Sequence, residues 1–360
     1  MAGRANGSPS AGWNKPFLQP GIHSLAEKPG HLLDAGALDT QEMIKLRQKF
    51  FISTLLLLSA ANLIAEEKSA EPRFITVTIP SQFLGMPRTV RIYLPASYHN
   101  SPERRYPVLY LHDGQNVFSF AGTNIAFGWG SWELDRTADA FSRDKKLQEI
   151  IMVGVDNSGA QRYAEYCGAH HSSEARTNTL FENYAAFLID ELKPRMDKEY
   201  RTKSDAEHTA VMGSSMGGIC SLILAWEHPD VFGGAASLSG AFIVEKTNFL
   251  DHVLRPYAGK PKDFKVYLDS GSIDYTGGDD GRALTGAVAG ELRRIGWSKG
   301  LVHFVDEKPL SEKDLMASGL RKDKWKEAQT SQHNEFYWRM RAWKPLTFLF
   351  SGSVANDSQK

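Results

Sequence analysis

Hydrophobic and polar residues follow two patterns in the part of the chain from residue 73 to residue 350. Helical periodicity marks one set of segments, and short apolar or alternating runs mark the other. The runs predict strands at 74–79, 89–94, 108–111, 150–155, 210–212, 235–238, 266–268 and 301–305, and the periodic segments predict helices at 181–196, 216–226, 282–295 and 335–350. Alternating strands and helices indicate one α/β domain with a mostly parallel central sheet and helices on both faces.

The N-terminal part has a different composition. Residues 1–42 are rich in Gly, Pro, Ala and Ser without periodicity, which predicts disorder, or a stretch that is not translated. Translation from Met43 would place basic residues before the apolar run 50–58 and small residues after it, as in a signal peptide over 43–65. A membrane anchor is the alternative, but the run is short of the about 20 apolar residues a spanning helix needs. We therefore expect a secreted or periplasmic protein with a disordered tail at 351–360.

Charge and cysteine content restrict the function. Lys plus Arg and Asp plus Glu each total 42, so the net charge is zero and no broad field attracts nucleic acid or anionic lipid. The two cysteines, Cys167 and Cys220, lack the spacing of a zinc or redox site, although a disulfide between them remains open. His170 and His171 beside Cys167 also lack that spacing, so we expect no metal.

One motif carries nucleophilic chemistry. Gly213-Ser214-Ser215-Met216-Gly217 fits G-x-S-x-G between a predicted strand and a predicted helix, which is the context that this motif requires. Glycines on both sides allow a strained turn that exposes the Ser215 hydroxyl at a helix N-terminus. Ser215 is therefore the candidate nucleophile.

A serine nucleophile needs a base and an acid that orients the base. His333 lies in a polar loop directly before the last predicted helix, and Asp274 lies just past the strand at 266–268. The chain order Ser215, Asp274, His333 is that of α/β-hydrolases. Asp269 is the main rival for the acid, and Asp279 and Asp280 are weaker ones.

The tetrahedral intermediate of acyl transfer needs N–H donors. The residue after the nucleophile, Met216, supplies one. The loop after the strand at 108–111 should supply the other N–H donor. In this loop we predict that Gln115, next to Gly114, is the donor residue.

Several segments together resemble the esterase family of the α/β-hydrolase superfamily that includes esterase D, enterochelin esterases, feruloyl and acetyl xylan esterases, and mycolyltransferases. The resemblance covers about residues 74–350 and rests on Tyr110 to Asn116, Trp132 with Asp135, Arg162 with Glu165-Tyr166, Gly213 to Gly218, His228 to Gly233, Ser239-Gly240, Gly271 with Asp274, and His333-Asn334-Glu335 with Trp338.

The resemblance implies a serine esterase that uses no metal or organic cofactor and acts on a small-molecule ester of a sugar, phenolic acid or siderophore. His112, Asp113 and Trp132 are then candidates to contact substrate. Arg162 and Glu165 would form an ion pair that braces their loop.

Two other functions remain open. Mycolyltransferase relatives pass the acyl group to a sugar hydroxyl, so an acyltransferase would use the same triad. A catalytically silent secreted binding module is the alternative from another class. The charged, weakly patterned segment 309–332 is expected to be a surface insertion at the rim of the site.

Overall fold

A computed structural model describes residues 72–167, 179–244, 247–297 and 300–351. The predicted N-terminal segment and signal peptide, the histidines at 170 and 171, and the predicted tail beyond residue 351 lie outside these residues. No helix in the described ranges combines the length and apolarity needed to cross a bilayer.

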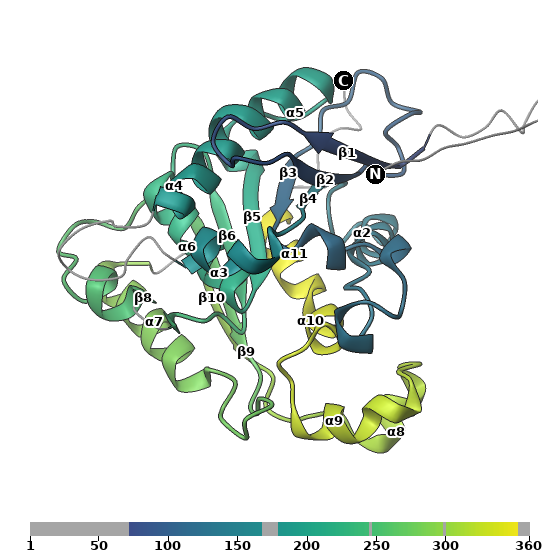
Figure 1. The fold of residues 1–360 in the computed structure, drawn as a ribbon, viewed down its shortest axis with the longest axis vertical. Coiled ribbons are helices and arrows are strands. Elements are labelled where there is room, and N and C mark those ends of the chain that lie inside the picture. Colours follow the sequence, from purple (N-terminus) through teal and green to yellow (C-terminus); the bar gives the residue numbers. More distant parts are fainter. Residues whose placement is uncertain (1–71, 168–178, 245–246, 298–299, 352–360) are drawn as a thin grey trace, which may run out of the picture. The chain divides into compact units, whose positions relative to one another are not determined.

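An eight-stranded sheet forms the centre of the domain (Figure 1), in the order β1-β2-β4-β3-β5-β6-β9-β10. β1 pairs with β2, and β2 with β4, in antiparallel register, and every later neighbouring pair is parallel. This confirms the expected α/β-hydrolase type of sheet. The strands are β1 (Phe74–Ile79), β2 (Arg88–Tyr93), β3 (Val108–Leu111), β4 (Ile151–Val155), β5 (Thr209–Ser214), β6 (Gly234–Leu238), β9 (Lys265–Ser270) and β10 (Leu301–Val305), beside a small hairpin of β7 (Ile243–Val244) and β8 (Thr247–Asn248).

Helices connect the strands, and each of the four predicted helical segments is found. The segment at 181–196 falls within α4, the π-helix η6 and α5, and the segment at 335–350 is divided into α10 and α11. The sequence did not predict α2, α3, η8, α8 or α9, nor the strands β7 and β8. The helices are α2 (Leu134–Arg143), α3 (Arg162–Cys167), α4 (Thr179–Ala186), η6 (Phe187–Leu192), α5 (Lys193–Glu199), α6 (Met216–Glu227), η8 (Leu250–Leu254), α7 (Arg282–Ile295), α8 (Glu312–Ala317), α9 (Trp325–Thr330), α10 (Glu335–Arg341) and α11 (Trp343–Phe350).

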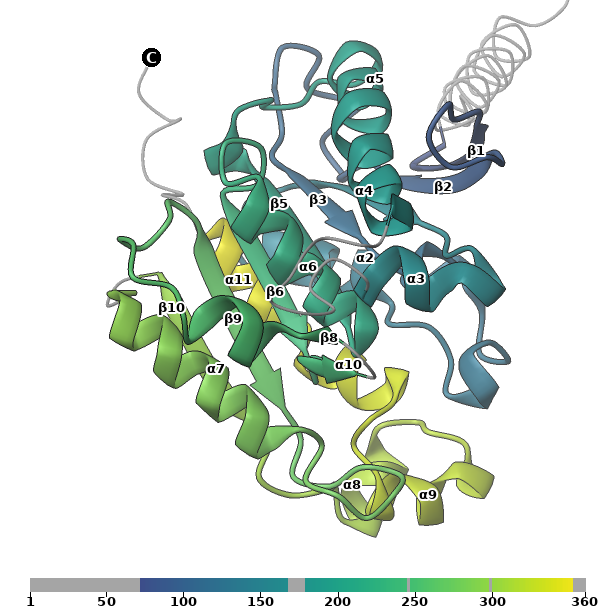
Figure 2. The ribbon, with the colours of Figure 1, turned by 60° about the vertical axis from the view of Figure 1, so that its left-hand side comes forward.

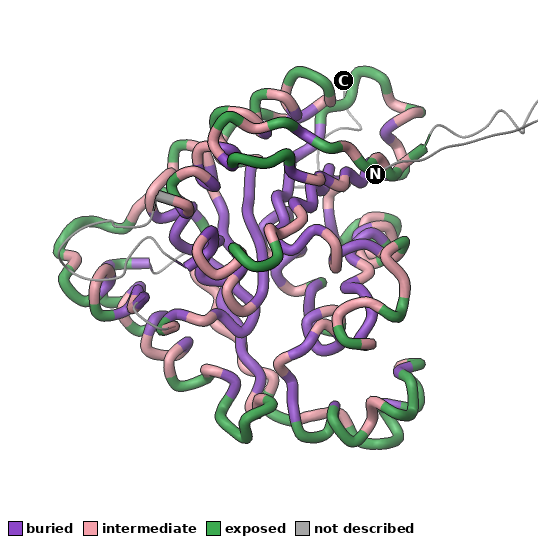
Figure 3. Tube along the Cα trace, in the orientation of Figure 1, coloured by how far each residue is buried: buried purple, intermediate pink, exposed green. Residues whose placement is uncertain are grey.

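Helices lie on both faces of the sheet, as Figure 1 and Figure 2 show together. On one face the alternate residues of the strands pack against α3, α4, α6 and α7, for example Val211 with Ile219 and Val288 in one apolar cluster. On the other face they pack against α2, α10 and α11, for example Met212 with Leu346. Buried positions therefore follow the central strands closely (Figure 3). Burial on both faces explains why these strands are apolar runs instead of alternating ones.

The parallel strands β5, β6, β9 and β10 end at the same edge of the sheet. Each strand is followed there by a polar residue or a turn: Ser215 after β5, Ser239 after β6, Gly271 after β9 and Asp306 after β10. Ligands of open α/β sheets bind at the carboxyl ends of the strands. The candidate catalytic residues gather at this edge.

Candidate active site

Ser215 occupies a strained turn between β5 and α6. Its φ of 52° and ψ of −120° are conformations that a side chain with a Cβ atom rarely adopts. A Cβ at position 213 would lie 2.7 Å from the backbone of Gly217, and a Cβ at position 217 would lie 3.1 Å from the Cβ atom of the His112 side chain. Gly213 is therefore required for the helix to approach the strand this closely, and a side chain at position 217 would force His112 to shift. The turn leaves Ser215 partly exposed at the N-terminus of α6.

Hydrogen bonds to the end of β6 fix the backbone of the turn. Ser215 N–H donates to the Leu238 carbonyl at 2.9 Å, and Ala241 N–H donates to the Ser215 carbonyl at 3.0 Å. The Oγ atom of Ser215 forms no hydrogen bond with other residues that the structure describes. These two hydrogen bonds attach the turn to residues before and after Ser239, which belongs to the loop after β6.

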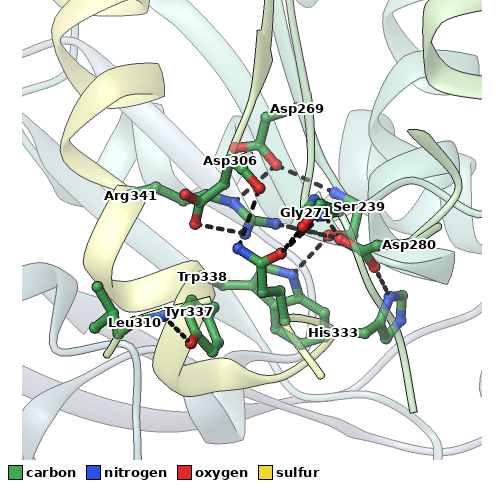
Figure 4. Close-up of polar contacts among 12 residues, drawn as sticks. Ser239, Asp269, Gly271, Asp280, Asp306, Leu310, His333, Tyr337, Trp338 and Arg341 are labelled. Atoms are coloured by element: carbon green, nitrogen blue, oxygen red, sulfur yellow. Dashed lines mark hydrogen bonds and ion pairs between the residues drawn. The ribbon is translucent and has the colours of Figure 1, made fainter. Parts of the chain in front are cut away.

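His333 pairs with Asp280. The Nδ1 atom of the imidazole lies 2.6 Å from Asp280 Oδ1, as Figure 4 shows. The Asp280 side chain is completely buried, whereas that of His333 is 20% exposed. A buried carboxylate on Nδ1 selects the tautomer in which Nε2 is free to accept a proton.

The structure corrects the predicted partner of His333, which was Asp274. Asp274 is instead bonded within its own loop, where its carboxylate accepts hydrogen bonds from the backbone N–H and the hydroxyl of Thr276 and from Gly278 N–H. Asp269, the main rival, is fully buried and accepts a hydrogen bond from Arg341. Asp280 reaches the histidine because the chain turns back between Gly277 and Gly281 before α7 begins.

Three linked residues of this edge have left-handed backbone conformations. Ser215, Ser239 and Asp280 have φ values of 52°, 47° and 53°. Such conformations cost about 1–3 kcal/mol each and concentrate at functional sites. Because Ser239 donates to Asp280 and its neighbours bind Ser215, the three strained positions form one connected assembly.

The predicted N–H donors lie on two neighbouring turns. Met216 is the first residue of α6, so its N–H has no acceptor within the helix. Gln115 lies in the 3-10 turn η1 (Gly114–Asn116) directly after β3, and its side-chain oxygen accepts a hydrogen bond from Asn157 N–H at 3.1 Å. That side chain is thus used to tie the turn to the loop after β4, which leaves the backbone N–H of Gln115 as the candidate donor.

His112 and Asp113, which were predicted to contact substrate, are buried among protein groups. The His112 Nδ1 atom lies 2.9 Å from the Tyr184 hydroxyl, and burial lowers the pKa of the imidazole to about 3. Asp113 accepts two hydrogen bonds from the Arg162 guanidinium, at 2.7 and 2.6 Å, and one from Asn157. We therefore reassign both residues from substrate contact to support of the turn that carries Gln115.

Two other expectations about side chains also change. Trp132 is buried in an apolar cluster, with its ring 5.8 Å from that of Trp338. The predicted ion pair between Arg162 and Glu165 is wrong. Arg162 binds Asp113, and Glu165 binds Arg88 of β2 through two hydrogen bonds of 3.0 and 2.7 Å.

Two residues that the sequence did not single out for a role lie beside the candidate pair. Tyr275 is 75% exposed, and its ring lies 5.8 Å from that of His333 in an edge-on contact. Glu335, two residues after His333, accepts a hydrogen bond of 3.4 Å from Asn116 of the η1 turn. Burial raises the pKa of Glu335 to about 7. The sequence signal for Glu335 was its place in the segment His333-Asn334-Glu335, and Tyr275 had only its position next to Asp274.

The segment 309–332, which the sequence predicts to be a surface insertion, contains α8 and α9. Leu315, Leu320 and Ala328 pack with Trp129 and with Phe336 of α10 in an apolar cluster of their own. The Tyr337 hydroxyl accepts a hydrogen bond from Leu310 N–H. These contacts attach the insertion to the helix that follows His333.

One group in the described ranges has ligand atoms close enough to hold a metal ion. Asp205, Glu207 and His208 have their ligand atoms within 4.8 Å of one another. They precede β5, at the edge of the sheet opposite Ser215, and both acidic residues are exposed. The group is remote from the candidate catalytic residues, and we assign it no part in their chemistry.

The fold and the strained serine turn define an α/β-hydrolase, and comparison with known proteins gives the family. The model of the family described as "Putative esterase" matches residues 81–303, which is more than half of the chain. The chain therefore belongs to this esterase family.

Individual relatives agree with this assignment. An endo-1,4-beta-xylanase/feruloyl esterase of Xylanibacter ruminicola is 30% identical over 175 residues, which are 46% of this chain and 21% of that protein. A ferulic acid esterase structure has a TM-score of 0.54 at 18% identity, covering 77% of this chain and 98% of the other. The enterobactin esterase of Shigella flexneri, solved with enterobactin, has a TM-score of 0.56 at 16% identity, covering 78% and 59%.

Proposed function

We propose that this protein hydrolyses carboxylic esters through an acyl-enzyme, with Ser215 as nucleophile, His333 as general base and Asp280 as the acid that orients it. The 2.6 Å contact between His333 and the buried Asp280 is the observation that carries the proposal. It lies at the sheet edge that also holds the strained Ser215 turn. Family membership supports ester chemistry at that edge.

Each step of the proposed reaction has a residue assigned to it. His333 Nε2 takes the proton of Ser215 as Oγ attacks the ester carbonyl, and Asp280 stabilises the imidazolium that forms. The N–H groups of Met216 and Gln115 donate to the oxyanion. His333 then gives the proton to the leaving alcohol, and water, activated by the same imidazole, releases the acid and regenerates Ser215.

Small aromatic, sugar or siderophore esters are the proposed substrates. A relative and two solved structures of similar fold carry names that refer to feruloyl and enterobactin esters. In this chain, exposed Tyr275 stands beside His333 and offers a flat apolar surface to a bound ring. No observed contact favours transfer of the acyl group to a sugar hydroxyl over its transfer to water.

Pre-steady-state kinetics with p-nitrophenyl acetate tests this proposal. An acyl-enzyme mechanism predicts a burst of p-nitrophenol equal to the enzyme concentration when deacylation is slower than acylation. A panel of feruloyl, acetyl-sugar and siderophore esters then ranks kcat/KM. Absence of turnover with every ester in the panel would contradict the proposed function, and turnover that requires an added sugar acceptor would contradict hydrolysis.

A further inference from the structure

A buried polar network lies directly behind Asp280 and is centred on the Ser239 hydroxyl. Ser239 Oγ donates to Asp280 Oδ2 at 2.7 Å, and it accepts hydrogen bonds from Arg341 Nη2 at 2.6 Å and from Trp338 Nε1 at 3.1 Å (Figure 4). A hydroxyl has one proton to donate and two lone pairs. Its full capacity is therefore used, and its proton is directed at the carboxylate.

The same network satisfies the oxygens of Asp280. Oδ2 accepts from Ser239 and from the backbone N–H of Gly271, while Oδ1 faces His333. Charge-assisted hydrogen bonds of this kind fix the rotamer of a buried carboxylate. The orientation of His333 consequently depends on the residues that hold Ser239.

Arg341 also holds Ser239 and is itself anchored. It is 3% exposed, and its Nε atom donates to Asp269 Oδ1 at 3.0 Å. Asp269 also accepts from the Tyr267 hydroxyl at 3.2 Å. Ser239 N–H donates to the Asp269 carbonyl at 2.9 Å. The ion pair and the serine therefore form one rigid unit between β6, β9 and α10.

We propose that Ser239, Arg341 and Asp269 are positioning residues for the reaction, acting through Asp280 to orient His333 and to set the pH range in which it works as a base. This inference rests on the proposed function, because it assigns a role relative to the Asp280–His333 pair. None of the three residues needs to touch substrate.

Arg341 is the cation that balances the acidic groups here. Its Nη2 lies 3.9 Å from Asp280 Oδ2 and its Nη1 lies 3.8 Å from Asp306 Oδ2. Burial raises the pKa of Asp269 to about 6 even though the guanidinium opposes this. The titratable and charged groups around the Asp280–His333 pair are Arg341, Asp269, Asp306, Asp274, Tyr267 and Tyr275. Lys344 interacts electrostatically with Asp306.

The sign of the expected pH effect follows from this charge balance. A protonated imidazole cannot act as a base, so kcat/KM falls on the acid side of the profile. Removing the Arg341 cation leaves the neighbouring carboxylates unbalanced, which favours the imidazolium. In Arg341→Met the acid limb of kcat/KM should therefore move to higher pH by about one unit, while kcat falls roughly tenfold to a hundredfold.

Matched variants separate charge from position. Arg341→Met with Asp269→Asn removes one charge of each sign, so the acid limb should return toward wild type while kcat remains low. Ser239→Ala leaves the ion pair in place and should lower kcat with little change in KM. Arg339→Met is the control, since Arg339 lies on the same helix and bonds to Ser131 and Glu133.

The experiment measures pH profiles of kcat and kcat/KM for p-nitrophenyl acetate, with folding checked by circular dichroism. The inference would be overturned if the acid limb of kcat/KM in Arg341→Met stayed at the wild-type pH, or if Ser239→Ala kept the wild-type kcat. If Arg341→Met does not fold, the kcat of Ser239→Ala still decides. Wild-type protein that neither reacts with a fluorophosphonate nor turns over would count against the proposed function instead.

Discussion

The Nδ1 atom of His333 lies 2.6 Å from the Oδ1 atom of Asp280, and the carboxylate is sealed from solvent while the imidazole is 20% exposed. The two residues come from loops 53 positions apart in the chain. This contact distinguishes Asp280 from three other nearby aspartates, and several consequences can be measured.

Replacing the orienting acid should reduce catalysis without unfolding the protein. Asp280→Asn should lower kcat by about 10⁴-fold, because the amide favours the wrong imidazole tautomer. Asp274→Asn is the matched control and should retain nearly full activity, since Asp274 binds only its own loop. Steady-state kinetics with p-nitrophenyl acetate compares the two. If Asp274→Asn lost most of its kcat while Asp280→Asn kept it, Asp274 and not Asp280 would be the orienting acid.

Tyr275 should affect the binding of aromatic esters. Its ring is exposed and contacts the edge of His333. Tyr275→Ala should raise KM for a feruloyl ester by about two- to tenfold, because one aromatic contact contributes about 0.5–1.5 kcal/mol. Tyr275→Phe keeps the ring and should restore KM. Equal effects of both variants would show that the ring does not contact the substrate.

Glu335 should make stability depend on pH in a specific direction. Burial raises the pKa of its carboxyl from the ordinary 4.5 to about 7. Between these values the folded protein keeps a proton that the unfolded chain releases, so folding stability falls as pH rises from about 4.5 to about 7. Glu335→Gln removes this titration.

Urea unfolding of the two proteins tests the Glu335 prediction. The free energy of unfolding of Glu335→Gln, relative to wild type, should increase across that pH window and then level off. A difference that stays constant from about pH 4.5 to pH 8 would show that Glu335 is ionised in the folded protein throughout.

The buried ion pair between Arg88 and Glu165 should contribute to the integrity of the fold. Both side chains are 3% exposed or less. Glu165→Ala leaves a buried guanidinium without its carboxylate, which should lower the free energy of unfolding by about 3–5 kcal/mol. Glu199→Ala breaks an exposed pair with Arg195 and should cost no more than about 1 kcal/mol. Similar losses in both variants would contradict this difference.

The fold could be predicted because its signals are local. A strand buried on both faces must be apolar along its length, so runs such as 108–111 and 266–268 identify strands without further information. The turn at Ser215 is also local, since Gly213 is required by its contact with the backbone of Gly217, four residues later. Helix α2, by contrast, has only a few buried residues among polar ones, and its periodicity was not recognised.

The acid could not be chosen from the sequence, because the choice depends on the path of a loop. Asp269 lies near the end of β9, and Asp274 and Asp280 follow in the loop before α7. Only the left-handed turn at Asp280 and Gly281 brings the third carboxylate back to His333. The roles of His112 and Asp113 were equally hidden, since their partners Tyr184 and Arg162 come from distant helices.

Labelling of Ser215 by a fluorophosphonate probe tests the central claim most directly. The wild-type protein should acquire one covalent label, located by mass spectrometry on the peptide that contains Ser215. Ser215→Ala should lose both labelling and esterase activity while its circular dichroism is unchanged, because only the oxyanion site and substrate binding would remain, roughly 10³-fold over water. A Ser215→Ala variant that keeps wild-type turnover, or a label on another serine, would contradict the account.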